Sequence, residues 1–191
     1  MPHKTPARER LIQAASDLFY SEGIVATGID TITARAGVAK MSLYNNFASK
    51  AELVQAYIEA RHAEWQQLYQ ERLKGAATPQ ARILAVFDSY LDHAAFEYER
   101  GFRGCGLYNA AAELPAGDPG RASVAAQKEE AERLIRDSLQ DLLPEDSLRA
   151  EETAEHLSFL LEGAMTRAGL EGHDARLRTA RRMAEALLQR L

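Results

Sequence analysis

A short stretch near the N-terminus carries the side chains that proteins use to read duplex DNA. If residues 39–47 form a helix, its exposed positions are basic, polar or aromatic: Lys40, Met41, Ser42, Tyr44, Asn45 and Asn46. Lysine contacts phosphate or guanine, and an asparagine amide can make two hydrogen bonds with adenine. Tyrosine hydroxyls suit phosphate oxygens. These residue types favour a helix that contacts both bases and phosphates.

A first helix is expected to support this stretch from residues 6–21. Thr5 is predicted to cap it, and Pro6 suits its first position because that position needs no backbone N–H donor. Apolar side chains recur at helical spacing and share one face: Leu11, Ala14, Ala15, Leu18 and Phe19. Gly23 lies just beyond its expected end.

A second short helix is predicted over residues 28–36, where Thr27 and Asp30 resemble a capping box. Gly37 then permits a tight turn into residues 39–47, where Leu43 and Phe47 are the expected i, i+4 core pair. A helix, a turn and a further short helix make the layout of a helix-turn-helix, whose last helix enters the major groove. The same pattern also occurs as a structural corner of helical bundles, and the pattern alone favours neither interpretation.

The remainder of the chain also has a helical pattern. Ser49 and Glu52 form a capping box that begins a long helix reaching residue 74. Further helices are expected over residues 79–99, 105–113, 119–142, 145–168 and 173–189. Since no sustained apolar–polar alternation is present, we predict an all-α protein. Its predicted domains are a helix-turn-helix domain over residues 1–50 and a helical ligand-binding and dimerisation domain over residues 51–191.

Composition narrows the class of protein. The 191 residues carry a net charge of −5, with 46% hydrophobic and 27% charged residues, which is typical of a globular chain. No apolar run approaches the roughly 18 residues of a membrane span. The N-terminus lacks an apolar signal segment, and the single Cys105 cannot form an internal disulfide, so we expect a cytoplasmic protein without membrane contact.

Residues 8–53 resemble the N-terminal domain of the TetR family of transcriptional regulators. The matching segments are ERLIQAASDLFYSEGIVATGID, ITARAGVAK and SLYNNFASKAEL. The segment RGCGLYNAAAEL (103–114) is similar to a stretch found in some members. The resemblance implies a homodimer that binds an inverted-repeat operator in double-stranded DNA. It also implies a small-molecule effector that binds among the C-terminal helices and releases the DNA.

The resemblance also implies roles for single residues. Thr27, Tyr44 and Lys50 match positions that usually touch phosphate, and residues 40–46 match the recognition helix. Met41 stands where the family often has glycine, and Asn46 replaces a frequent histidine. Ala39 stands where serine or threonine is common, so it cannot cap the next helix with its side chain, at a cost of about 1 kcal/mol. No operator sequence can be transferred, because the residues that differ are those that read bases.

The C-terminal part offers an effector site and a dimer interface. Pockets are mostly apolar with a few orienting polar groups, and we expect the effector to be mainly apolar and bound by Trp65, Phe87, Tyr90, Tyr108 and Asn109. The last two long helices carry apolar stripes, which the resemblance assigns to a four-helix dimer interface made by Leu157, Leu161, Ala164, Ala168, Ala184 and Leu188. Packing within one subunit is the alternative for both sets.

Enzymatic motifs are not visible in the sequence. The five histidines lack metal-ligand spacing, and no phosphate loop, G-x-S-x-G motif or dinucleotide fingerprint occurs, so no metal or cofactor is expected. Cys105 is expected to be a buried small side chain, with a redox sensor as the alternative. The sequence predicts a ligand-responsive repressor. The alternatives are a helical enzyme or small-molecule carrier with a structural N-terminal corner, and an adaptor that binds proteins.

Overall fold

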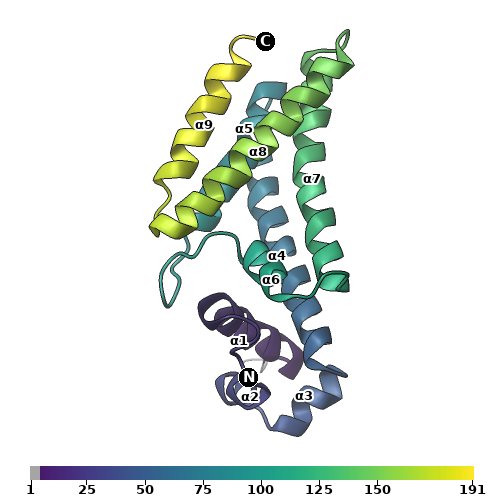
Figure 1. The fold of residues 1–191 in the computed structure, drawn as a ribbon, viewed down its shortest axis with the longest axis vertical. Coiled ribbons are helices and arrows are strands. Elements are labelled where there is room, and N and C mark those ends of the chain that lie inside the picture. Colours follow the sequence, from purple (N-terminus) through teal and green to yellow (C-terminus); the bar gives the residue numbers. More distant parts are fainter. Residues whose placement is uncertain (1–4) are drawn as a thin grey trace. The chain divides into compact units, whose positions relative to one another are not determined.

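The computed structural model describes residues 5–191, which form nine helices and no strands (Figure 1). The all-α prediction is therefore confirmed. In chain order the helices are α1 (Ala7–Glu22), α2 (Ile29–Ala36), α3 (Lys40–Asn46), α4 (Lys50–Leu73), α5 (Pro79–Ala94), α6 (Gly106–Glu113), α7 (Pro119–Leu142), α8 (Ser147–Glu171) and α9 (Ala175–Leu188). None of these helices is both long enough and apolar enough to cross a membrane.

The chain folds as two compact units that do not follow the expected boundary after residue 50. Unit 1 comprises the described residues up to His62 together with residues 98–101 and 106–124. Unit 2 comprises residues 63–97, 102–105 and 125–191. The division falls inside α4 because the first turns of that helix bury Leu53 and Tyr57 in unit 1, where the Tyr57 ring meets the Phe19 ring edge-on at 5.5 Å.

Unit 1 is built around α1, which packs against α2, α3 and α6. The stripe predicted on α1 faces this core, with Leu11, Ala14, Ala15 and Phe19 buried. Leu18, from the same predicted stripe, is only half-buried.

Unit 2 has its own apolar core, in which α9 packs on both α5 and α8. Figure 1 shows α8 and α9 side by side, joined by a short turn at Gly172. Aromatic rings fill one part of the core, where Trp65 and Tyr69 stack at 5.8 Å and Trp65 meets Tyr90 edge-on at 6.2 Å.

Helix ends differ most from the sequence predictions. Pro6, not Thr5, occupies the N-cap of α1, and Gly28, not Thr27, occupies the N-cap of α2; neither helix has a side-chain cap. The Ser49 hydroxyl accepts from the Glu52 N–H as predicted, at 3.2 Å. The Glu52 carboxylate, however, accepts from the N–H of Ala48 at 2.6 Å, one residue earlier than a capping box requires.

A close backbone approach in unit 2 requires glycine on α8. A Cβ built on Gly169 would lie 2.7 Å from the Cα of Gly104 and 2.8 Å from the carbonyl oxygen of Arg103. Gly104 itself has φ +78°, a left-handed conformation that disfavours other residues. The α8 helix therefore contacts residues 103–104 through bare backbone.

We predict that Gly169→Val lowers the free energy of unfolding by about 2 kcal/mol, because overpacking against backbone cannot be relieved by a rotamer change. Chemical denaturation followed by circular dichroism measures the change. Gly75→Val is the matched control, since a Cβ there meets no heavy atom within 4 Å. Equal losses in the two variants would contradict the proposed backbone contact.

Candidate nucleic-acid interface

The α3 helix has one buried and one exposed side. Leu43 is 0% exposed, and Phe47, directly after the helix, is 1% exposed. This i, i+4 pair was predicted from spacing and is confirmed. A seven-residue helix is too short to be stable alone in water, so these two contacts hold α3 on the rest of unit 1.

The turn between α2 and α3 is fixed by backbone geometry and by one arginine. Gly37 adopts φ 61°, ψ 42°, and the N–H of Val38 donates to the carbonyl oxygen of Thr33 at 3.0 Å. The guanidinium Nη1 of Arg10, on α1, donates to the carbonyl oxygens of Ala36 and Gly37 at 3.0 and 3.1 Å. Sequence reasoning missed this role, because a lone arginine on a helix does not identify its acceptor.

The exposed side of α3 presents most of the residues expected to read DNA. Met41 is 68% exposed and Tyr44 48% exposed, and Asn45 is exposed beside them. Lys40 is also exposed, with its ammonium 2.8 Å from the carboxylate of Asp30. The hydrogen bond to Asp30, reinforced by its charge, raises the pKa of Lys40, so Lys40 stays cationic near neutral pH.

Asn46, the last polar residue of α3, uses its side-chain amide for a hydrogen bond within the helix. The Asn46 amide nitrogen donates to the carbonyl oxygen of Ser42 at 2.7 Å, and both residues are half-buried. Asn45 therefore presents its amide more openly than Asn46, and base reading through Asn46 would require this bond to break.

Two residues expected to touch phosphate hydrogen-bond instead to carbonyl groups of the α1–α2 loop. Thr27 is 3% exposed, and its hydroxyl donates to the carbonyl oxygen of Gly23 at 2.6 Å. The Lys50 ammonium donates to the carbonyl oxygen of Ile24 at 2.5 Å and lies 6.0 Å from the centre of the Phe19 ring. In this conformation both side chains stabilise the α1–α2 loop, which corrects their expected placement on the DNA-binding surface.

Arg8 is a basic residue near α3 that sequence reasoning did not single out. It is exposed, and its guanidinium carbon lies 5.2 Å from the centre of the Phe47 ring. Its charge was visible only as part of the excess of basic residues in the first 50 positions. The fold places this cation beside the C-terminal end of α3.

Segments distant in sequence also support the α1–α2 region of unit 1. The Glu113 carboxylate, at the end of α6, accepts from the N–H groups of Ile24 and Val25 at 3.0 and 2.7 Å. In the loop after α5, Glu99 pairs with Arg35 of α2 at 2.5 Å. The hydrogen bond from Arg35 and its charge lower the pKa of the Glu99 carboxyl, which keeps this exposed pair ionised near neutral pH.

The expected effector residues are divided between the two units. Trp65, Phe87 and Tyr90 lie in the core of unit 2, whereas Tyr108 and Asn109 belong to α6 in unit 1. Tyr108 is 36% exposed. They are assigned to different units because the chain changes unit three times between residues 97 and 106.

Tyr90 belongs to a polar group inside unit 2 that includes residues not predicted from sequence. Its hydroxyl donates to Glu162 at 2.8 Å and accepts from the Lys128 ammonium at 3.1 Å. Lys128 and Glu162 form an ion pair at 3.0 Å, with side chains only 15% and 16% exposed. Burial, with the negative charge of Glu162, raises the pKa of Tyr90 well above 10, so the phenol stays protonated.

Most residues expected at a dimer interface are buried within the single chain. Five of the six are at most 4% exposed and belong to the core of unit 2: Leu157, Leu161, Ala168, Ala184 and Leu188. This corrects the predicted interface, because the stripes predicted on α8 and α9 pack inside unit 2, where α9 lies against α8 and α5. Ala164 alone of the six lines a surface groove between α8 and α9.

Both parts of the chain match family profiles. Residues 11–57 match the profile of bacterial regulatory proteins of the TetR family, and residues 79–184 match the tetracyclin repressor-like C-terminal domain. The second match alone covers more than half of the chain. The chain belongs to the TetR family. This membership identifies α2 and α3 as the helix-turn-helix of a transcriptional regulator.

Relatives of this TetR-family chain are named as regulators and not as enzymes. The transcriptional activator FasR of Mycolicibacterium smegmatis is 29% identical over 73% of the chain, and the match spans only 60% of FasR. The transcriptional regulator AcuR of Cereibacter sphaeroides is 29% identical over 89% of the chain and 80% of AcuR. A solved TetR-family regulator from Streptomyces coelicolor has a TM-score of 0.85 at 29% identity, covering 96% of this chain and 88% of that one.

We predict that Arg10→Ala destabilises unit 1 by about 1–2 kcal/mol, because two carbonyl groups at the helix-turn-helix turn lose a charged donor. Thermal unfolding of the purified protein measures the loss. Operator affinity is the second measurement, and Arg82→Ala is its matched control. This variant removes an arginine that pairs with Asp141 in unit 2, so it should leave operator affinity unchanged. An Arg10→Ala protein with wild-type stability and operator affinity would contradict the positioning role.

Proposed function

We propose that this chain is a one-component repressor in the cytoplasm, which binds an inverted-repeat operator as a homodimer and is released by a small-molecule effector. The observation that supports it most directly is the composition of the exposed face of α3. Lys40, Tyr44 and Asn45 offer phosphate and base contacts on a helix whose opposite side is buried. A merely structural corner has no need of polar, base-reading side chains on its exposed face.

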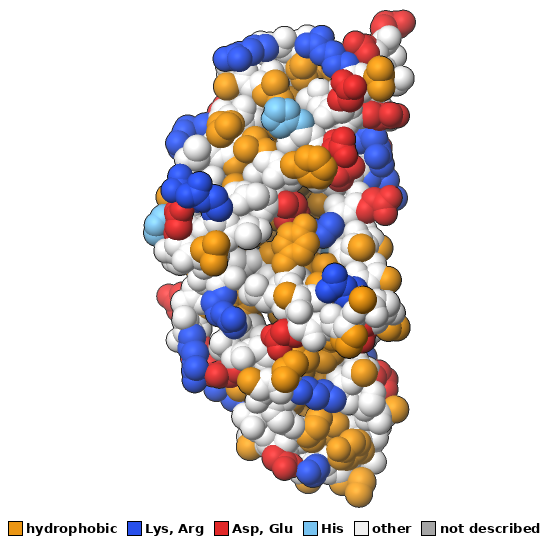
Figure 2. All heavy atoms as spheres, viewed as in Figure 1, with side chains coloured by type: hydrophobic (Ala, Val, Ile, Leu, Met, Phe, Trp, Pro, Cys, Tyr) orange, Lys and Arg blue, Asp and Glu red, His pale blue; other side chains and the backbone are white. Residues whose placement is uncertain are grey.

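A second copy of the chain is the proposed partner of the groove between α8 and α9. The groove has a volume of about 350 Å³ and is mainly apolar, although two arginines also line it; its lining residues are Phe159, Leu160, Gly163, Ala164, Arg167, Arg176, Thr179, Ala180 and Met183. Phe159 is 66% exposed and Met183 54% exposed. Figure 2 shows hydrophobic side chains among charged ones over α8 and α9. A Cβ on Gly163 would meet nothing within 4 Å, so this glycine leaves room for a helix of the partner.

We propose that the effector binds in unit 2, near the aromatic core of Trp65, Phe87 and Tyr90. The Lys128–Glu162 pair, together with Tyr90, supplies the few polar groups that orient a mainly apolar ligand. Tyr108 and Asn109 are assigned to unit 1 and are no longer part of this proposal.

Selection of bound duplexes from a random pool tests the main proposal. A twofold-symmetric dimer places its two recognition helices about one helical turn apart, roughly 34–36 Å, or slightly more. The recovered consensus should therefore be an inverted repeat with that spacing between half-site centres. A reporter gene downstream of the recovered site should be expressed more strongly when the chain is absent. A nonsymmetric consensus bound by one chain, or no consensus, would overturn the proposal.

Asn45 and Lys40 are predicted to have separable roles on that operator. Asn45→Ala should leave the salt dependence unchanged and relax the preference at one symmetric base position, by about 1–3 kcal/mol per half-site. Lys40→Ala should weaken binding to all sequences and lower the salt slope by about 1 per chain, hence about 2 per dimer. Affinities for single-base operator variants at several salt concentrations measure both effects.

Lys74→Ala provides the control for these two variants, since it removes an exposed lysine of unit 2 that pairs with Glu71. It should change neither base preference nor salt slope. If Asn45→Ala keeps the wild-type base preference, Asn45 is not a reading residue.

We predict that Phe159→Glu converts the dimer into monomers at micromolar concentration, because an interface with a second copy would bury a carboxylate where the wild type buries an apolar ring. Sedimentation velocity measures the mass. Leu170→Glu is the matched control on the same helix; Leu170 is 84% exposed and does not line the groove. A dimer that persists in the first variant, or dissociates equally in both, would contradict the assignment of the interface.

A further inference from the structure

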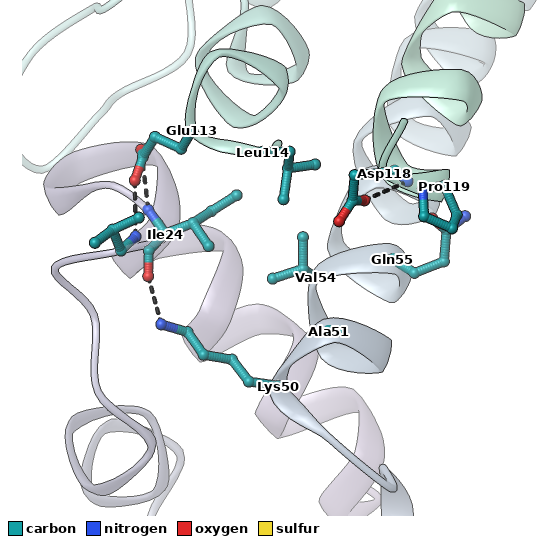
Figure 3. Close-up of a pocket in the computed structure, with 11 residues that line it drawn as sticks. Ile24, Lys50, Ala51, Val54, Gln55, Glu113, Leu114, Asp118 and Pro119 are labelled. Carbon is teal, nitrogen blue, oxygen red and sulfur yellow. Dashed lines mark hydrogen bonds between the residues drawn. The ribbon is translucent and has the colours of Figure 1, made fainter. Parts of the chain in front are cut away.

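Unit 1 contains a pocket that the proposed function does not use. It has a volume of about 520 Å³ and lies among the α1–α2 loop, the first turns of α4, the end of α6 and the start of α7 (Figure 3). Sites for small molecules usually have volumes of about 300–1,000 Å³. All residues that line this pocket belong to unit 1, so it is separate from the proposed effector site in unit 2.

The walls of the pocket are aliphatic. Ile24 and Val25 come from the α1–α2 loop, and Val54 comes from α4. Leu114 follows α6, and Pro119 begins α7. Val25 is 75% exposed although it is apolar. The residues that line the pocket include no aromatic ring. Such walls suit a flexible saturated chain better than a flat aromatic ring, which gains from stacking.

Two of the three charged residues at the pocket are engaged with the same loop. The Lys50 ammonium donates to the carbonyl oxygen of Ile24 at 2.5 Å. The Glu113 carboxylate accepts from the N–H groups of Ile24 and Val25. Figure 3 shows Lys50 and Glu113 approaching the loop from opposite sides. Their charges are opposite, so together they add no net charge to the pocket.

Asp118 is the third charged residue that lines the pocket, and it gives the pocket a net negative charge. It is half-buried, and its Oδ1 accepts from the N–H of Gly120 at 2.8 Å, which leaves its other oxygen available to a ligand. Figure 3 shows its carboxylate on the Val54 and Leu114 side of the pocket, away from Lys50. Among residues 5–191 no ion pair neutralises it. The nearby Arg121 directs its guanidinium to the carbonyl oxygen of Ala111.

We propose that this pocket binds a primary aliphatic amine, with its protonated nitrogen on Asp118 and its hydrocarbon chain between Val54, Leu114 and the α1–α2 loop. A primary alkylamine is cationic at neutral pH, as lysine is. An ammonium–carboxylate contact in a partly desolvated site is a strong, charge-assisted hydrogen bond. Such a ligand bridges the α1–α2 loop and the α6–α7 segment. Unit 1 would then respond to a small molecule through its own binding site.

Calorimetric titration of the DNA-free protein with octylamine, octanol and octanoate tests the proposal. We expect one octylamine per chain, octanol about tenfold weaker, and octanoate weaker still because it would meet the Asp118 carboxylate. Each additional methylene from hexylamine to octylamine should raise the affinity about fourfold. Because no DNA is present, failure here would leave the proposed regulatory function untouched.

Two variants locate the binding site. Asp118→Asn keeps an oxygen for the Gly120 N–H but loses the charge, so octylamine should fall to the affinity of octanol. Ala51→Trp places a large ring at an exposed position that lines the pocket and should abolish binding of both compounds. Asp137→Asn, an exposed carboxylate of α7 in unit 2, is the matched control and should bind octylamine as the wild type does.

Three results would overturn the proposal. The first is no binding of octylamine at millimolar concentration. The second is binding that neither Asp118→Asn nor Ala51→Trp changes, which would place the amine elsewhere on the chain. The third is tighter binding of octanoate than of octylamine, which would make Lys50 the polar partner and the ligand an anion. Circular dichroism of each variant verifies that unit 1 remains folded.

Discussion

The structure of unit 1 depends on a helix that cannot exist by itself. Helix α3 has seven residues, and helices of this length are unstable in water without tertiary contacts. Ala39 at its N-cap gives no side-chain hydrogen bond, which weakens it further. Its stability therefore comes from burying Leu43 and Phe47. Helices α1 and α2, which pack against α3, provide most of the surface that receives those two side chains.

The same constraint explains why unit 1 extends well beyond the first 50 residues. The loop between α1 and α2 is held by Lys50 from α4 and by Glu113 from α6, and α2 is held by Glu99. A structure limited to the three N-terminal helices would lack these contacts. The helix-turn-helix is thus supported through its α1–α2 loop by Glu113, which lies 89 positions beyond Ile24 in the sequence.

Periodicity predicted helices and their buried faces well, because burial of a helix depends on spacing along a single segment. It correctly predicted Leu43 and Phe47 as the core pair of α3, and it identified the exposed face around Asn45. Contacts of individual polar side chains were predicted less well. Thr27 caps no helix, because its hydroxyl donates to the carbonyl oxygen of Gly23. Lys50 binds a carbonyl group that only the folded chain brings near.

The buried stripe of α8 shows the same limit of prediction from spacing. Helix α8 has two apolar faces, one with Leu157 and Leu161 in the core of unit 2 and one with Phe159 and Gly163 in the groove. Spacing shows which residues share a face, but it does not show which face meets the chain's own helices. The more continuous leucine stripe packs internally, where uniform burial stabilises most. The more irregular face, with its glycine and isolated aromatic ring, stays exposed in the single chain, and it is the face that we propose for a second copy.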